Sequence, residues 1–264
     1  MAGDDRMTLH LVRLAIDRHP LAVYAAERRL ADDDGGYALH HALRNRFSSA
    51  APQPFRYFAE HPRGPHLLGY VADRSALDDA AALPSADDLL RSVFPTPPDV
   101  QEMPATWRAG SRYDFEVRAR PVVRFGKKKR AERAGRQDAW QRSASEIDAY
   151  VAACERVVAA GGDSKTVHRE HVYRDWLLAR LDGIAEIEAV DLRMALRQRT
   201  RRSRHATPDK PARTCPVEGP DALLAGTLRV TDPDRFAALL ARGVGRHAAF
   251  GFGMLLLRPP GRNG

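Results

Sequence analysis

Hydrophobic and polar positions along residues 1–105 follow the order of a small mixed α/β unit. Short segments rich in β-forming residues predict strands, and apolar positions at helical spacing predict helices. The predicted elements are a strand over 7–16, a helix over 37–47, a hairpin of strands 55–59 and 66–72, a helix over 85–91 that begins at Ser85, and a strand near 100–103. The apolar positions of residues 18–34 follow neither a helical nor a strand period. The order is βαββαβ.

The pattern then starts again. Residues 113–123 alternate strictly, with Tyr113, Phe115 and Val117 on one face of a predicted strand. The elements predicted after it are helices over 146–160 and 168–181, strands over 184–193 and 222–230, a helix from Pro233 to about Leu240, and a strand over 250–257. This order matches the first with one additional helix. We therefore predict an α+β fold of two tandem ferredoxin-like, RRM-like domains, residues 1–105 and 106–264.

Charge indicates the kind of partner. The 264 residues hold 42 Lys and Arg against 34 Asp and Glu, a formal net charge of +8. This excess favours a polyanion. No apolar run approaches the roughly 18 residues of a membrane span, and residues 1–6 lack the apolar core of a secretory signal. Cys154 and Cys215 form no CxxC pair, so a cytoplasmic protein without a zinc site or disulfide framework is expected.

Basic residues are clustered rather than spread evenly. The clusters are Lys127, Lys128, Lys129 and Arg130; Arg197, Arg199, Arg201, Arg202 and Arg204; and Arg118 with Arg120 on one face of the 113–123 strand. Such runs are either solvated faces or a grip on an RNA stem. An A-form stem hides its base edges in a narrow major groove, so contacts to phosphates and shape would dominate there.

A glycine-rich segment separates the last predicted helix from the last strand. It contains Gly243, Gly245, Gly251 and Gly253, with Arg246 and His247 between them. The spacing satisfies a loose dinucleotide-binding pattern, but that pattern should follow a strand and open a helix, and this segment follows a helix. Two interpretations remain: a turn needed only for packing, and an anion-binding loop, which we favour.

Tyr37 and His40 carry the candidate chemistry. They are three residues apart on the predicted helix and so share a face. An imidazole, with a pKa near 6.5, suits proton transfer at neutral pH. His41 points about 100° away on a helix and is the weaker candidate. His168 and His171 could suggest metal ligands, but no third ligand is near in sequence, and we expect no metal site.

These residues together resemble a known family. The segment 243–257, GVGRHAAFGFGMLLL, resembles the glycine-rich loop of the CRISPR-associated RAMP endoribonucleases, most closely the CasE branch of type I-E systems. Tyr37-Ala-Leu-His40 resembles the Tyr-x-x-His segment of that branch, and 113–121, YDFEVRARP, resembles its central strand. The resemblance extends from residue 7 to about 257 and is weakest over 132–162.

The resemblance implies two ferredoxin-like domains and metal-independent cleavage at the 3′ side of a CRISPR repeat hairpin, with no cofactor. It implies that His40 is catalytic and Tyr37 assists, and that the product stays bound within a surveillance complex of other subunits. Two alternatives stay open. One is a non-catalytic RNA-binding RAMP subunit on the same fold. The other is a scaffold protein whose basic surface binds nucleic acids without selectivity.

Overall fold

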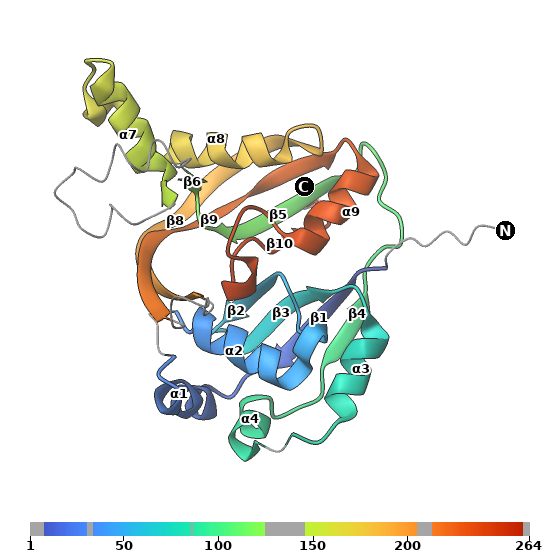
Figure 1. Ribbon diagram of the computed structural model, residues 1–264. Helices are drawn as coiled ribbons and strands as arrows, with labels where there is room; N and C mark the ends of the chain where they lie inside the picture. Colours follow the sequence, from blue (N-terminus) through green and yellow to red (C-terminus); the bar gives the residue numbers. More distant parts are fainter. Residues whose placement is uncertain (1–7, 31–33, 86, 125–145, 205–212, 261–264) are drawn as a thin grey trace.

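The computed structural model describes residues 8–30, 34–85, 87–124, 146–204 and 213–260 (Figure 1). The first half of the chain contains β1 (His10–Ala15), α1 (Arg18–Glu27), α2 (Gly36–Phe47), the 3-10 turn η1 (Ser48–Ala50), β2 (Phe55–Phe58), β3 (His66–Val71), α3 (Arg74–Ala82), α4 (Asp88–Val93) and β4 (Asp99–Glu102). The four strands form one antiparallel sheet in the order β2-β3-β1-β4. This is the strand order of a ferredoxin-like unit.

The second half repeats this arrangement. Its elements are β5 (Arg112–Ala119), β6 (Val122–Arg124), β7 (Glu146–Asp148), α7 (Ala149–Ala159), η2 (Ser164–Thr166), α8 (Arg169–Leu181), β8 (Ala185–Arg204), β9 (Arg213–Val230), α9 (Pro233–Arg242), η3 (Ala248–Phe250) and β10 (Leu255–Arg258). The main sheet has the order β10-β5-β9-β8 and is antiparallel throughout. Each half therefore places its first strand between its third and its last, and the predicted α+β ferredoxin-like class is confirmed.

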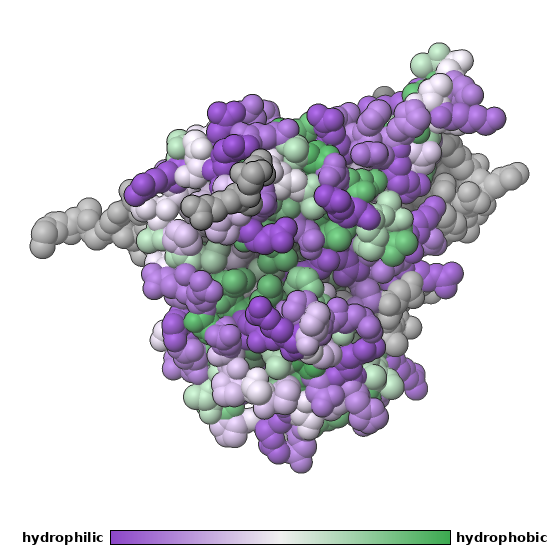
Figure 2. Space-filling view, turned by 180° about the vertical axis from the view of Figure 1, so that it is seen from behind, coloured by the Kyte–Doolittle hydropathy of each residue, from purple (hydrophilic) through white to green (hydrophobic). Residues whose placement is uncertain are grey.

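The two sheets pack against each other because successive residues of a strand face opposite sides of its sheet. In β1, Val12 and Leu14 face the helices of the first half, while Leu11 faces the second half. Tyr70 in β3 is 2% exposed, belongs to the core of the second half, and donates its hydroxyl to the Leu255 carbonyl at 2.9 Å. Figure 1 shows α8 above the upper sheet and α2 and α3 below the lower one. From behind, hydrophilic residues dominate the surface, and hydrophobic ones gather near the middle (Figure 2).

Helix limits follow the capping residues. Asp232 caps α9 by accepting from the Arg235 amide at 3.0 Å, and the helix begins at Pro233 as predicted. The helix predicted to begin at Ser85 instead begins at Asp88, because the Asp87 side chain accepts from the Leu90 amide. The prediction for 146–160 was wrong at its start. Residues 146–148 form β7, and the Asp148 side chain caps α7.

Two helices were missed, and the length of one hairpin was underestimated. Helix α1 lies in the region without a clear period, and α3 follows β3 directly. Strands β8 and β9 are far longer than predicted and stay paired from Ala185↔Val230 to Arg204↔Arg213. Beyond the end of β5, residues 196–204 and 213–221 project as a two-stranded arm, which curves toward α2 in Figure 1. Among the helices in the described segments, none combines the length and the apolar composition that a membrane span requires.

Candidate active site

Helix α2 carries Tyr37 and His40 on the side that meets the second half of the chain. Its N-terminus is set by Gly35, which has a positive φ of 71°, and by Asp34, whose carboxylate accepts from the Gly36 amide at 3.1 Å. Tyr37 and His40 both contact one ring, that of Phe250. The ring centroids lie 6.1 Å apart for Tyr37 and 4.8 Å apart for His40. The predicted common face of the two residues is therefore confirmed.

Phe250 belongs to the glycine-rich segment, which closes over α2. A Cβ on Gly36 would lie 2.5 Å from the Phe250 carbonyl oxygen, so only glycine allows this approach. Gly251 has φ +87° and passes close to the Phe55 ring. Gly243 and Gly253 also have positive φ, and the Val244 amide donates to the Gly253 carbonyl at 2.8 Å. The candidate site is thus built from both halves of the chain.

The close approach at Gly36 gives a testable change in stability. Alanine normally stabilises a helix relative to glycine by about 1 kcal/mol. At Gly36 the sign should reverse, because the added Cβ collides with backbone, and overpacking costs about 1–3 kcal/mol. Urea denaturation of Gly36→Ala should show a lower free energy of unfolding, whereas Ser75→Ala on the exposed side of α3 should change it little. A stabilised Gly36→Ala protein would contradict this packing.

His40 is partly buried and uncharged at neutral pH. Burial lowers its pKa below the usual 6.5, and the positive charges of Arg44 and His41 lower it further, against a backbone hydrogen bond with Ala249. A neutral imidazole can accept a proton. His41 lies apart from Phe250, in a polar cluster where its Nδ1 is 2.8 Å from the Tyr24 hydroxyl and 3.3 Å from Asn45 Nδ2. This placement agrees with the angular separation predicted for adjacent helical residues.

The histidine pKa values predict how stability depends on pH. Burial is the main cause of a lowered pKa at His40, His41 and His66. The unfolded chain therefore takes up protons first, as pH falls below about 6.5, and the folded state loses stability over that range. Urea unfolding at pH 7.5, 6.5 and 5.5 should show a falling midpoint, with a smaller fall in His40→Gln. A midpoint that rises between pH 7.5 and 5.5 would contradict these shifts.

Arg246 and His247 in the glycine-rich segment both face one carboxylate. His247 Nε2 lies 3.0 Å from Glu146 Oε2, and Arg246 Nε lies 2.5 Å from Glu146 Oε1. The His247 side chain is 4% exposed, and that of Arg246 is 51% exposed. An anion could therefore reach Arg246, whereas His247 is a packing residue in this conformation. Anion binding by this loop stays a prediction. Glu146 was not foreseen, because it lies a hundred residues away in the chain.

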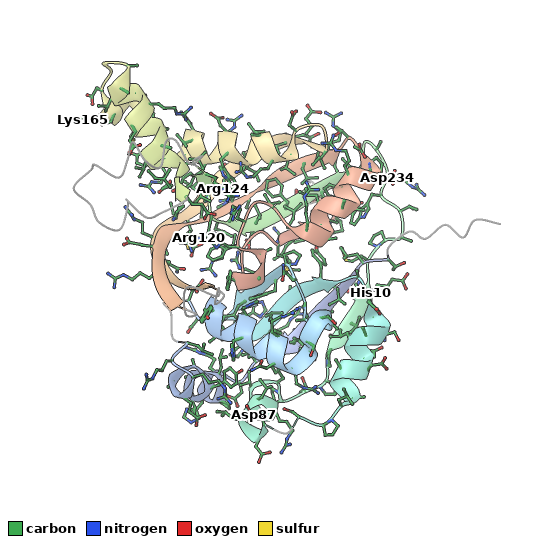
Figure 3. All side chains as sticks on the ribbon, viewed as in Figure 1. His10, Asp87, Arg120, Arg124, Lys165 and Asp234 are labelled. Atoms are coloured by element: carbon green, nitrogen blue, oxygen red, sulfur yellow. The ribbon has the colours of Figure 1, made fainter. Side chains whose placement is uncertain are left out.

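Arg118 and Arg120 were predicted to contact RNA, but the structure places both inside the protein. The Arg118 side chain is 12% exposed and lies between the carboxylates of Asp34 and Asp221. Arg120 is 1% exposed and donates to the carbonyls of Pro220 and Gln198 (Figure 3). A buried guanidinium needs such partners, and these two arginines fix the base of the arm. Their burial argues against direct phosphate contacts in this conformation.

Five of the remaining basic residues belong to the arm: Arg197, Arg199, Arg201, Arg202 and Arg204. Arg199 is exposed, and Arg197 pairs with Glu218 at 3.2 Å across the two strands. The backbone of Arg201, Arg202 and Arg204 continues β8, but their side chains lie outside the described part of the structure. Lys127, Lys128, Lys129 and Arg130 lie outside the described residues altogether. Their predicted roles in RNA binding stay predictions.

Sequence reasoning missed two neighbours of His40. Phe250 was counted only as part of the glycine-rich motif, and Arg44 was not singled out. Arg44 lies one turn after His40, is exposed, and forms no ion pair within the described ranges. The i, i+4 spacing of two polar residues was the available signal. The ring centroids of His168 and His171 lie 5.4 Å apart, and no group of three potential metal ligands occurs in the described segments.

Solved structures share this fold. They include CRISPR endoribonuclease Cse3 bound to 19 nt RNA (21% identity, TM-score 0.59) and Thermus thermophilus Cse3 bound to an RNA representing a pre-cleavage complex (20%, 0.54). A third is the CRISPR-associated protein Cas6e from Escherichia coli K-12 (17%, 0.51). Each match covers 96% of this chain and 100% of the other. The chain thus shares the fold of these structures.

Sequence comparison gives the family. The model of the CRISPR associated protein family matches residues 9–259, nearly the whole chain. The chain belongs to that family. No curated protein matches it in sequence.

Proposed function

We propose that this protein is a metal-independent endoribonuclease that cleaves CRISPR repeat hairpins in precursor RNA to produce guide RNA. The observation that carries the proposal is the contact of His40 with Phe250 of the glycine-rich segment, at the meeting of the two halves, in a chain of this family. The 2′-hydroxyl beside the scissile phosphate is the nucleophile. Its attack on phosphorus forms a 2′,3′-cyclic phosphate and releases the 5′-oxygen of the next nucleotide.

His40 transfers the protons in this mechanism. Its lowered pKa keeps the ring neutral at pH 7, so it accepts the proton of the 2′-hydroxyl and then donates one to the departing 5′-oxygen. Tyr37 is 7% exposed and stacked on Phe250, which suits a residue that orients the site rather than one that exchanges protons with solvent. Fixed geometry of this kind supplies much of the rate, because the reaction needs in-line attack.

Arg44 is the cation best placed to stabilise the charge on the reacting phosphate. It lies one turn from His40, and its positive charge acts on that ring. It is exposed, so a phosphate could reach it. An arginine aimed at the developing charge lowers the barrier most where water is excluded. A bound phosphate would also raise the pKa of His40 and favour the protonated form that donates to the leaving oxygen.

The arm is the surface that would hold the RNA stem. It carries Arg197, Arg199, Arg201, Arg202 and Arg204, and it curves toward α2 (Figure 1). Contacts from this arm to stem phosphates would place the base of a hairpin near His40. We further propose that residues 1–105 and 106–264 are separate domains that grip the RNA between them. Other subunits of a type I-E surveillance complex would then hold the processed RNA with this protein.

The test is an end-labelled repeat RNA from the source genome, mixed with protein in excess EDTA and analysed on a sequencing gel. We expect one cut, with a cyclic phosphate on the upstream product and a 5′-hydroxyl on the downstream one. Cleavage lost in EDTA and restored by Mg²⁺ would overturn the metal-independent mechanism. Tight binding without cleavage in either condition would instead assign the protein to the non-catalytic RNA-binding subunits.

A further inference from the structure

A buried charge cluster joins the two halves of the chain beside the candidate site. The Arg118 guanidinium is its centre. Arg118 Nε and Nη2 donate to the two carboxylate oxygens of Asp221 at 2.9 and 2.6 Å, and Nη2 also lies 2.8 Å from Asp34 Oδ2. Asp221 is fully buried, and the side chain of Asp34 is 5% exposed. Asp34 comes from the first half, whereas Arg118 and Asp221 come from the second.

Asp34 uses its two oxygens for two different tasks. Oδ2 accepts from Arg118, and Oδ1 accepts from the Gly36 amide, the first residue of α2. Only one helical turn separates Gly36 from His40, a rise of about 6 Å. The Asp34 carboxylate therefore connects a strand of the second half directly to the helix end that carries Tyr37 and His40.

The same guanidinium also contacts the arm and the glycine-rich segment. Nη2 donates to Gln198 Oε1 at 2.8 Å, and Gln198 is a residue of the arm. The guanidinium carbon lies 4.6 Å from the centroid of the Phe252 ring, which is fully buried. Phe252 follows Phe250 by two residues, and the Gly253 amide donates to the Arg118 carbonyl at 2.6 Å. Arg118 thus touches each of the three parts that must come together around His40.

A contribution to the stability of the fold does not by itself explain why this chain buries such a charge cluster. Burying charges costs desolvation energy that their attraction often fails to recover, and apolar contacts would hold two halves together as well. What an ion pair with several directed hydrogen bonds provides is a fixed relative orientation. We propose that Asp34 and Arg118 are positioning residues that hold the start of α2, and with it His40, in register with the arm and the glycine-rich segment. This inference rests on the proposed ribonuclease function.

Asp34→Asn is the sharpest test. The variant keeps the shape of the side chain and can keep an oxygen for the Gly36 amide, but it turns an NH₂ group toward the donor Nη2 of Arg118. A misplacement of about 1 Å can cost about 100-fold in rate. In single-turnover reactions at saturating protein, we expect cleavage to slow by about 10- to 100-fold, while the Kd for repeat RNA changes by less than about threefold.

The control is Thr227→Val. It removes another partly buried hydrogen bond between β5 and β9, from Thr227 Oγ1 to Asp114 at 3.0 Å, and it should leave cleavage near wild type. The rate-against-pH curve separates positioning from electrostatics. Positioning lowers the Asp34→Asn rate equally at every pH, whereas loss of a charge acting on His40 would move the midpoint of the curve.

Arg118→Lys is the second variant, since lysine keeps the charge but lacks the planar fork that donates to both oxygens of Asp221 while also reaching Asp34. We expect it to slow cleavage at saturating protein as Asp34→Asn does. Wild-type rates in both variants, or a defect confined to Kd, would overturn the positioning role while leaving the ribonuclease in place. Failure of both to fold would also overturn it, because the pair would then act on the fold as a whole. If the wild-type protein did not cleave the repeat RNA, that result would contradict the proposed ribonuclease function itself.

Discussion

Replacing His40 with alanine should abolish cleavage of the repeat RNA and leave its binding within about threefold of wild type. General acid–base catalysis contributes about 10²- to 10⁴-fold, and His40 is the histidine that contacts the glycine-rich segment through Phe250 while facing Ala249. Single-turnover rates and Kd values for the same labelled RNA measure the two effects separately. A His40→Ala protein that cuts at the wild-type rate would contradict the assignment.

His41→Ala is the matched control for this experiment. The two histidines are adjacent, both are partly buried, and both have a lowered pKa. His41 differs in its partners, because it contacts Tyr24 and Asn45 rather than Phe250. Its loss should therefore reduce stability slightly and leave the rate within about tenfold of wild type. A larger loss in His41→Ala than in His40→Ala would transfer the catalytic role to His41.

Neutralising the arm should give the largest effect on binding. The variant changes Arg199, Arg201, Arg202 and Arg204 to glutamine. A plot of the logarithm of the association constant against the logarithm of the salt concentration has a negative slope, and each lost phosphate contact should make that slope less negative by about 0.7–0.9. The total change would be about three, and the Kd near 0.15 M salt should rise by about 100-fold or more. Filter binding or fluorescence anisotropy over a salt series measures both values.

The control for the arm variant removes charge elsewhere on the surface. Arg74 and Arg91 are exposed arginines of α3 and α4, which lie apart from the arm in Figure 1. Arg74→Gln with Arg91→Gln should leave the slope close to that of wild type. An arm variant with an unchanged slope would show that the arm does not touch the RNA backbone, and the solvated-face interpretation of these arginines would then hold.

Local patterns predicted the elements that carry the candidate site. The helix with Tyr37 and His40 follows from apolar positions at helical spacing, and α9 follows from Asp232 and Pro233 at its start. The glycine-rich segment was identified from composition, and the positive φ angles of Gly243, Gly245, Gly251 and Gly253 explain why glycine occurs there. These features depend on interactions between near neighbours in sequence, which a pattern can reveal.

The arm and the buried charge cluster could not be predicted in the same way. The arm is rich in arginine and lacks the alternation of a half-buried strand, because much of it projects beyond the sheet. Asp34 and Asp221 lie 84 and 103 residues from Arg118, so nothing local links them. The strict alternation of β5 placed Arg118 on the correct face, but only the packing of the two halves determined that this face is buried at that point.

One measurement tests the central claim, that the RNA supplies its own nucleophile to a site built around His40. It compares cleavage of the repeat RNA with cleavage of the same RNA carrying a single 2′-deoxy nucleotide at the scissile position, both with wild-type protein in EDTA. The account predicts one discrete cut in the first RNA and none in the second, with equal binding of both. Equal cleavage of the two RNAs would contradict it, since water or another nucleophile would then attack the phosphate.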